Sequence, residues 1–134
     1  NNELSVADAE GLVKALLANR IDENVELVQA FTRMYNLVKD VTYTGVDESL
    51  LKEEAERALY EMATKASEAS IDAWDKNDYD AVVAVPATLV PAINTFFEDV
   101  MVMDKDEAIK ANRLQLVRLA YSVMAIIGDI SALK

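Results

Sequence analysis

The chain contains no cysteine and no histidine, which removes most of the side chains that enzymes and metal sites use. This absence excludes metal sites built from thiolates or imidazoles, Cys or His nucleophiles and Ser-His-Asp triads. Absence of cysteine also fits a cytoplasmic location, although a domain with an adequate core needs no disulfide in any compartment. We therefore expect a noncatalytic domain that binds neither a metal nor a cofactor.

Glycine and proline are also scarce, with three and two residues among 134. Because 52% of the residues are apolar and breakers are few, the composition favours long helices around one core. The predicted fold class is all-α, an antiparallel helical bundle in which residues 1–134 form a single domain. The chain has no initiator Met and opens in mid-pattern, so we expect a piece of a longer subunit.

The charge is strongly one-sided, with 24 acidic and 13 basic residues and a formal net charge of −11. Nonspecific affinity for nucleic acid comes from Lys and Arg, so a general nucleic-acid binder is disfavoured. Any surface that faces RNA must be small and local.

Nothing in the sequence predicts a membrane segment. The longest strongly apolar run, residues 114–127, carries Gln115 and Arg118 and is shorter than the roughly 20 residues of a spanning helix. No basic segment followed by an apolar one marks a signal peptide. We expect no membrane partner.

Apolar residues at helical spacing, with capping residues beside them, predict the helices. Ser5 to Asp8 forms a capping box for the first helix, and Asp22 caps the second. The longest helix is expected to start at Asp47 or Ser49. Asp104 or Asp106 should cap the last one. The expected helices cover residues 5–19, 22–39, 47–75, 91–100 and 104–128, the last of them ending at Gly128.

The segments between these helices carry turn and break signals. Residues 41–46 are β-branched and end at a glycine, so we expect an extended connector, with a short strand as the alternative. A helical segment that begins at Asp78 or Asp80 meets Pro86, where a break is expected. Pro91 suits the first turn of the next helix.

Two acidic clusters could suggest calcium loops, but neither completes the EF-hand pattern. A loop that starts at Asp75 places Asp80 where the turn glycine belongs and Pro86 where the bidentate glutamate belongs. A loop that starts at Asp104 places Ile109 at the glycine position. These acids are more simply helix caps and solvated surface.

Two apolar pairs, Phe96 with Phe97 and Met101 with Met103, allow two interpretations. Methionine-rich surfaces suit adaptable partner binding. At helical spacing beside other apolar residues, however, such side chains more often belong to a core. We take the core as the default.

The basic residues divide by their local acidic neighbours. Four of them have acids three or four positions away, within reach on a helix: Lys14, Lys52, Arg57 and Lys110. Arg33, Arg113 and Arg118 have none at these spacings. The second group is better placed to contact phosphates or bases, and pairing with a carboxylate on another helix stays open as the alternative.

Four stretches carry a resemblance to a known family. In order they are Arg33-Met-Tyr-Asn-Leu-Val-Lys39, Val46 to Tyr60, Phe96-Phe-Glu-Asp-Val-Met-Val-Met103 and Asn112-Arg-Leu114. Together they resemble the DALR-type anticodon-binding domain at the C-terminal end of bacterial glycyl-tRNA synthetase β subunits. The likeness covers the chain from about Arg33 onward, while the first 30 residues fit only by helical pattern.

The resemblance implies a noncatalytic domain that binds the anticodon region of the tRNA for glycine. It also implies a cytoplasmic ligase in which ATP and magnesium bind the α subunit of an α2β2 assembly. The alternative is a helical module for subunit or domain contact. We expect the two helices that bear the RNA-binding candidates to lie side by side and to present a small patch. These candidates are Arg33, Asn36, Lys39, Asn112, Arg113 and Arg118.

Overall fold

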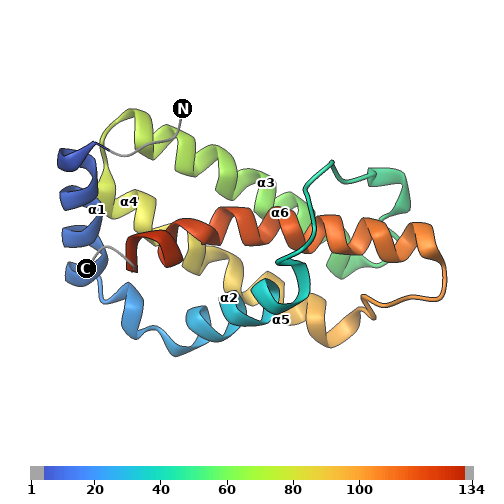
Figure 1. The fold of residues 1–134 in the computed structure, drawn as a ribbon. Coiled ribbons are helices and arrows are strands. Elements are labelled where there is room, and N and C mark those ends of the chain that lie inside the picture. Colours follow the sequence, from blue (N-terminus) through green and yellow to red (C-terminus); the bar gives the residue numbers. More distant parts are fainter. Residues whose placement is uncertain (1–4, 132–134) are drawn as a thin grey trace.

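The computed structural model describes residues 5–131, and side chains as far as residue 125 (Figure 1). No strand occurs within these residues, and the all-α prediction is confirmed. The elements are α1 (Val6–Ala18), η1 (Ile21–Glu23), α2 (Val25–Val38), η2 (Glu48–Leu50), α3 (Glu54–Asp75), α4 (Tyr79–Ala84), η3 (Pro86–Leu89), α5 (Val90–Asp99) and α6 (Glu107–Ser131), where η denotes a 3-10 helix.

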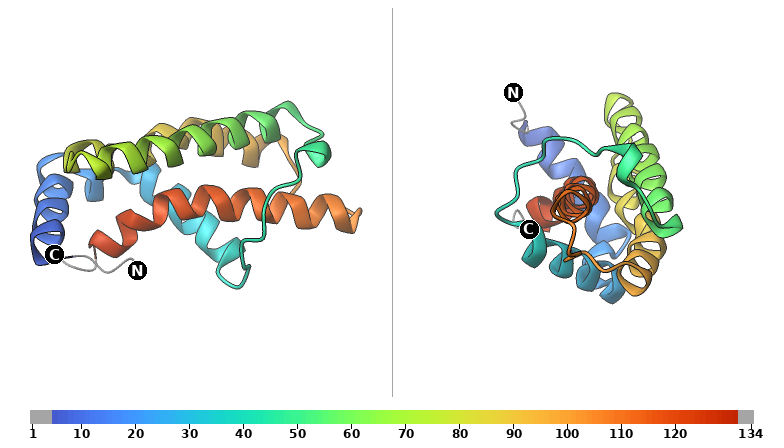
Figure 2. Two further views of the ribbon diagram at one scale, coloured as in Figure 1. Left: turned by 90° about the horizontal axis from the view of Figure 1, so that it is seen from above. Right: turned by 90° about the vertical axis from the view of Figure 1, so that its right-hand side faces the viewer.

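The last helix, α6, forms the centre of the bundle. Figure 2 (right) looks along it and shows the other helices arranged around it. It packs against α1, α2 and α3. The helices α2 and α5 run in the direction opposite to α6, whereas α3 runs in the same direction (Figures 1 and 2). The predicted side-by-side placement of α2 and α6 is confirmed.

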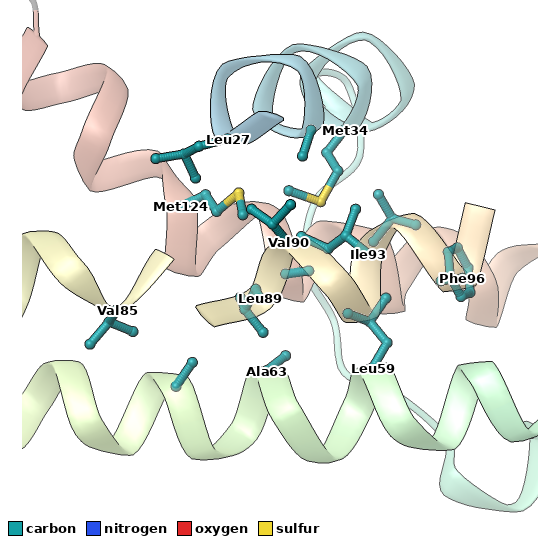
Figure 3. Close-up of a cluster of buried hydrophobic side chains, with 14 of the residues drawn as sticks. Leu27, Met34, Leu59, Ala63, Val85, Leu89, Val90, Ile93, Phe96 and Met124 are labelled. Carbon is teal, nitrogen blue, oxygen red and sulfur yellow. The ribbon is translucent and has the colours of Figure 1, made fainter. Parts of the chain in front are cut away.

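The broken segment α4–η3–α5 supplies much of the core. Helix α4 ends before Pro86, as predicted, and Pro91 lies in the first turn of α5. Residues 79–99 are long and apolar enough to cross a membrane by length and composition, with mean hydropathy 1.5. Leu89, Ile93 and Phe96 are nevertheless fully buried in the helical core (Figure 3). Burial among helices accounts for this apolar stretch.

Two helices start later in the chain than predicted. Asn24 rather than Asp22 opens α2, since its Oδ1 accepts from the backbone N–H of Leu27 at 3.0 Å. Asp47 caps only the short η2. Helix α3 starts at Glu54, later than the predicted start at Asp47 or Ser49.

The predicted stop of the last helix at Gly128 is wrong. Helix α6 continues to Ser131 and spans 25 residues. An interior glycine costs a helix only about 1 kcal/mol relative to alanine, which a long, packed helix tolerates. Glycine therefore ends a helix only where a left-handed cap is also formed.

Helix α1 is fastened across one end of the bundle through Tyr79 of α4. The Tyr79 hydroxyl donates to Asp8 Oδ1 at 2.6 Å, and the tyrosine ring lies directly over Gly11. A Cβ at position 11 would come within 2.5 Å of the ring, so only glycine permits this approach. Asp8 thus serves both the N-terminal cap of α1 and the contact with α4.

Candidate nucleic-acid interface

Arg113 is buried, and its proposed contact with RNA is corrected. Only 4% of the residue is exposed. Its Nη2 donates to Glu56 Oε1 at 3.0 Å, and its Nη1 donates to the Met101 carbonyl at 2.7 Å and to Asp104 Oδ2 at 3.3 Å. The pairing with another helix is the alternative that spacing along the chain left open.

Asn112 is also buried, with 5% of its surface exposed. Its side-chain oxygen accepts from the backbone N–H of Asp47 at 2.7 Å, and its Nδ2 donates to the Asp47 carbonyl at 3.0 Å. An amide matches a backbone peptide group by donating and accepting at once. This residue therefore fixes the connector before α3 and does not face RNA.

Arg118 is half-buried and also serves the connector. Its Nε donates to the Val41 carbonyl at 3.0 Å, and its Nη1 donates to Ser122 Oγ at 2.6 Å. Gln115, which sequence reasoning missed, binds Thr42 and Thr44 in the same way. The spacing of three between Asn112, Gln115 and Arg118 is the signal that one face of α6 acts as a unit. These three side chains hold residues 41–47 extended across α6 (Figure 1).

The α2 candidates remain at the surface. Arg33, Asn36 and Lys39 are all exposed. The Arg33 guanidinium lies 4.1 Å from the centre of the Phe97 ring, a cation–π contact between α2 and α5. No carboxylate within the described residues forms an ion pair with Arg33 or Lys39. Residues 27–39 contain no acidic residue at all, although Asp40 follows directly. We call the exposed Arg33, Asn36 and Lys39 the α2 strip.

A groove of about 450 Å³ lies beside the α2 strip. It is lined by Arg33, Asn36, Leu37, Phe97 and residues 100–103. Met101 and Met103 are 70% and 57% exposed, so the default of a core position is wrong for them. Val100 and Val102 alternate with them and are buried. That alternation is typical of an extended segment and was the available signal in the sequence.

The other acids and cations are arranged as ordinary surface charge. Of the local pairings expected for Lys14, Lys52, Arg57 and Lys110, none forms an ion pair in the described part of the chain. No group of three or more acidic side chains that could hold a metal ion is present among the described residues. The groups available to a ligand at the α2 strip and its groove are cationic side chains, an amide, an aromatic ring and two thioethers.

Comparison with known protein families shows which family the chain belongs to. The DALR anticodon binding domain family matches residues 27–130, which include the groove and most of α2 and α6. The chain belongs to the DALR anticodon-binding domain family. The resemblance inferred from the motifs is thereby confirmed.

Curated relatives carry the same domain within much longer chains. A glycine–tRNA ligase beta subunit of Geobacter sp. is 38% identical over 130 residues, which cover 96% of this chain and 19% of the relative. The beta subunits of Clostridioides difficile and Alteromonas mediterranea are 39% and 40% identical over 82% and 84% of this chain. They are matched over 16% and 17% of their own length. This DALR domain thus spans about a fifth of the relatives it matches. No solved structure matches it.

Proposed function

We propose that this domain binds the anticodon region of the tRNA for glycine as part of a glycine–tRNA ligase β subunit. The observation that carries the proposal is the family match over residues 27–130, because it includes the helix that bears the α2 strip. In this proposal the domain is noncatalytic. The ligation of glycine, with its ATP and magnesium, takes place in the α subunit of an α2β2 enzyme.

Local charge supports the α2 strip as the contact despite the net charge of −11. Between residues 27 and 39 the chain carries Arg33 and Lys39 and no acid. Interactions between exposed charges are largely screened beyond about 8–10 Å at physiological salt, so distant acids on α3 weaken this strip little. A strip with two cations and one flanking acid, Asp40, can therefore bind phosphates locally while the rest of the surface disfavours nonspecific binding.

The test compares two pairs of exposed cations in the complete αβ enzyme. The double variant Arg33→Gln with Lys39→Gln should raise KM for tRNA about tenfold and make the dependence of log KM on log salt shallower by about one to two. The control removes equal charge from α3 and its C-cap, with Lys65→Gln and Lys76→Gln. Equal effects of the two double variants would show that only net charge matters and would refute the α2 strip.

Exposed apolar residues in the first part of the domain favour a second role in contact with another domain of the same subunit. Leu17 of α1 and Val25 and Val28 of α2 are 49%, 66% and 43% exposed. Since the relatives are about five times as long as this domain, the remainder of such a chain provides a surface to cover them. Leu17→Ser should then weaken domain packing in the full subunit, measured by limited proteolysis, without changing KM for tRNA.

A further inference from the structure

The groove beside α2 contains an arginine whose flat side chain is already fixed in place. The Arg33 guanidinium carbon lies 4.1 Å from the centre of the Phe97 ring, yet the residue remains exposed. Arg33 also lines the groove, so the part of its guanidinium that does not contact Phe97 is accessible from there. A guanidinium held in this way is a cationic plate on which a planar ring can stack.

The remaining walls suit the same kind of ligand. Met101 and Met103 present exposed thioethers, which adapt their shape to a planar group. Asn36 follows Arg33 by one helical turn and lines the same groove. Its amide offers two donors and one acceptor to the edge of a ring.

Buried contacts hold the rim of this groove in position. The Arg113 Nη1 donates to the Met101 carbonyl and to Asp104 Oδ2, while its Nη2 is held by Glu56 of α3. The Asp104 carboxylate is thus engaged by Arg113, and no acidic residue lines the groove. A ligand that is planar and attached to phosphates matches these walls.

We propose that this groove holds one unstacked nucleobase of single-stranded RNA, stacked on the accessible part of the Arg33 guanidinium. Met101 and Met103 cover the base from the connector side, and Asn36 hydrogen-bonds its edge. An apolar peptide segment fits less well, because it would bury the Arg33 charge and the Asn36 amide without partners. The proposal rests on tRNA binding by the domain and specifies what the groove itself takes.

The experiment measures coupling between Arg33 and single bases in the complete αβ enzyme. Arg33→Lys keeps the charge for phosphates but removes the flat plate. It is assayed with tRNA for glycine that carries an abasic nucleotide at one anticodon-loop position at a time. We expect Arg33→Lys to lose about tenfold in affinity for intact tRNA. At one abasic position the wild-type enzyme should lose about the same affinity relative to intact tRNA. The Arg33→Lys variant should lose no further affinity at that position.

Two further variants keep the outcome clear. Arg20→Lys, an exposed arginine paired with Glu23, is the matched control and should bind all tRNAs as wild type does. Met101→Ser should couple to the same abasic position as Arg33→Lys. The substitution at Arg33 and the abasic nucleotide each lower the affinity for tRNA. If these two losses multiply independently at every abasic position, the base site is refuted, while tRNA binding through the α2 strip stands.

Two other results would refute the base site for different reasons. If neither Arg33→Lys nor the paired Gln substitutions at Arg33 and Lys39 change tRNA affinity, both the α2 strip and the base site are refuted. If Arg33→Lys and Met101→Ser instead weaken association of the α and β subunits at unchanged tRNA affinity, measured by sedimentation, the groove is a protein contact and the base site is refuted.

Discussion

Helices α2 and α3 both pack on α6, yet their outer surfaces carry very different charge. Helix α3 holds six acidic and two basic residues, whereas α2 holds one acidic residue, Glu26, and one basic residue, Arg33. The net charge of −11 therefore describes the α3 side far better than the α2 side. Composition averages over surfaces that a ligand meets one at a time, so an acidic domain can still offer a local site for an anion.

One acidic residue of α3 is buried instead of exposed, and its contacts connect the α3 side of the domain with the α2 side. Glu56 is fully buried and its Oε1 accepts from Arg113 and from the backbone N–H of Glu53. Arg113 in turn holds Met101 at the rim of the groove. The acidic helix thus contributes one carboxylate to the arrangement of the opposite surface.

The largest expected effect comes from breaking this link. Arg113→Ala leaves Glu56 buried without its partner and should lower the free energy of unfolding by about 3–5 kcal/mol. Urea denaturation of the full β subunit or of the refolded domain measures it. The double change Arg113→Met with Glu56→Met should recover most of that loss, because an apolar pair leaves no buried charge. A single variant as stable as wild type would contradict the buried pair.

A smaller effect is expected from placing a carboxylate on the α2 side. Asn36→Asp changes no shape but adds a negative charge beside the groove. It should raise KM for tRNA by about three- to tenfold in the complete enzyme, with a normal melting temperature. Removing a carboxylate from α3 by Glu68→Gln is the matched control and should leave KM unchanged. If Glu68→Gln instead lowers KM by the factor by which Asn36→Asp raises it, only net charge matters and the contrast between the helices has no functional meaning.

Asp8 is an acidic residue with a structural role, because it accepts a hydrogen bond from the Tyr79 hydroxyl. That bond, with a second from Ser5, lowers the pKa of Asp8 below its ordinary value. A lowered folded-state pKa means that the stabilisation is present above the unfolded-state value near 3.8 and is lost as pH falls through the folded-state pKa. Tyr79→Phe should therefore destabilise the domain at pH 7, and its melting curve should converge with that of wild type once the pH has fallen through the folded-state pKa of Asp8. A constant gap down to pH 2 would contradict this.

The smallest effect is expected for a surface pair on α3. Lys65 lowers the pKa of Glu61, and Glu61 raises the pKa of Lys65, through a contact of 2.8 Å. The pair therefore stabilises the folded domain between the pKa of Glu61 and the pKa of Lys65. This stabilisation is lost when Glu61 is protonated at low pH and when Lys65 is deprotonated at high pH. Both side chains are exposed, so Glu61→Gln should give no measurable change in melting temperature at physiological salt. A clear loss would mean that charge on α3 is structural.

Most of the fold could be predicted because its signals are local. Ser5, the break at Pro86 and the extended connector act within a few residues of themselves, and each behaves as expected. Gly128 did not, because a glycine ends a helix only when the surrounding packing lets the chain turn. The start of α3 was missed since Asp47 and Glu53 are both adequate caps, and tertiary contacts choose between them.

The site was harder to predict because it depends on partners distant in sequence. Arg33 and Arg113 look alike in having no acid one turn away, yet Arg113 meets Glu56 at 57 positions' distance while Arg33 meets only an aromatic ring. Spacing along one helix cannot distinguish them. The exposed Met101 and Met103 likewise became part of the groove only once Val100 and Val102 had turned inward.

The central place of α6 has a consequence for how the chain folds during synthesis. Every other helix precedes α6 in sequence, yet α1, α2 and α3 all bury apolar side chains against it. While the ribosome is still translating residues 107–125, those faces have no partner and are open to chaperones or to aggregation. The connector at 41–47 must also wait for Asn112, Gln115 and Arg118 before it is held. Folding of this domain is therefore tied to the arrival of its last helix.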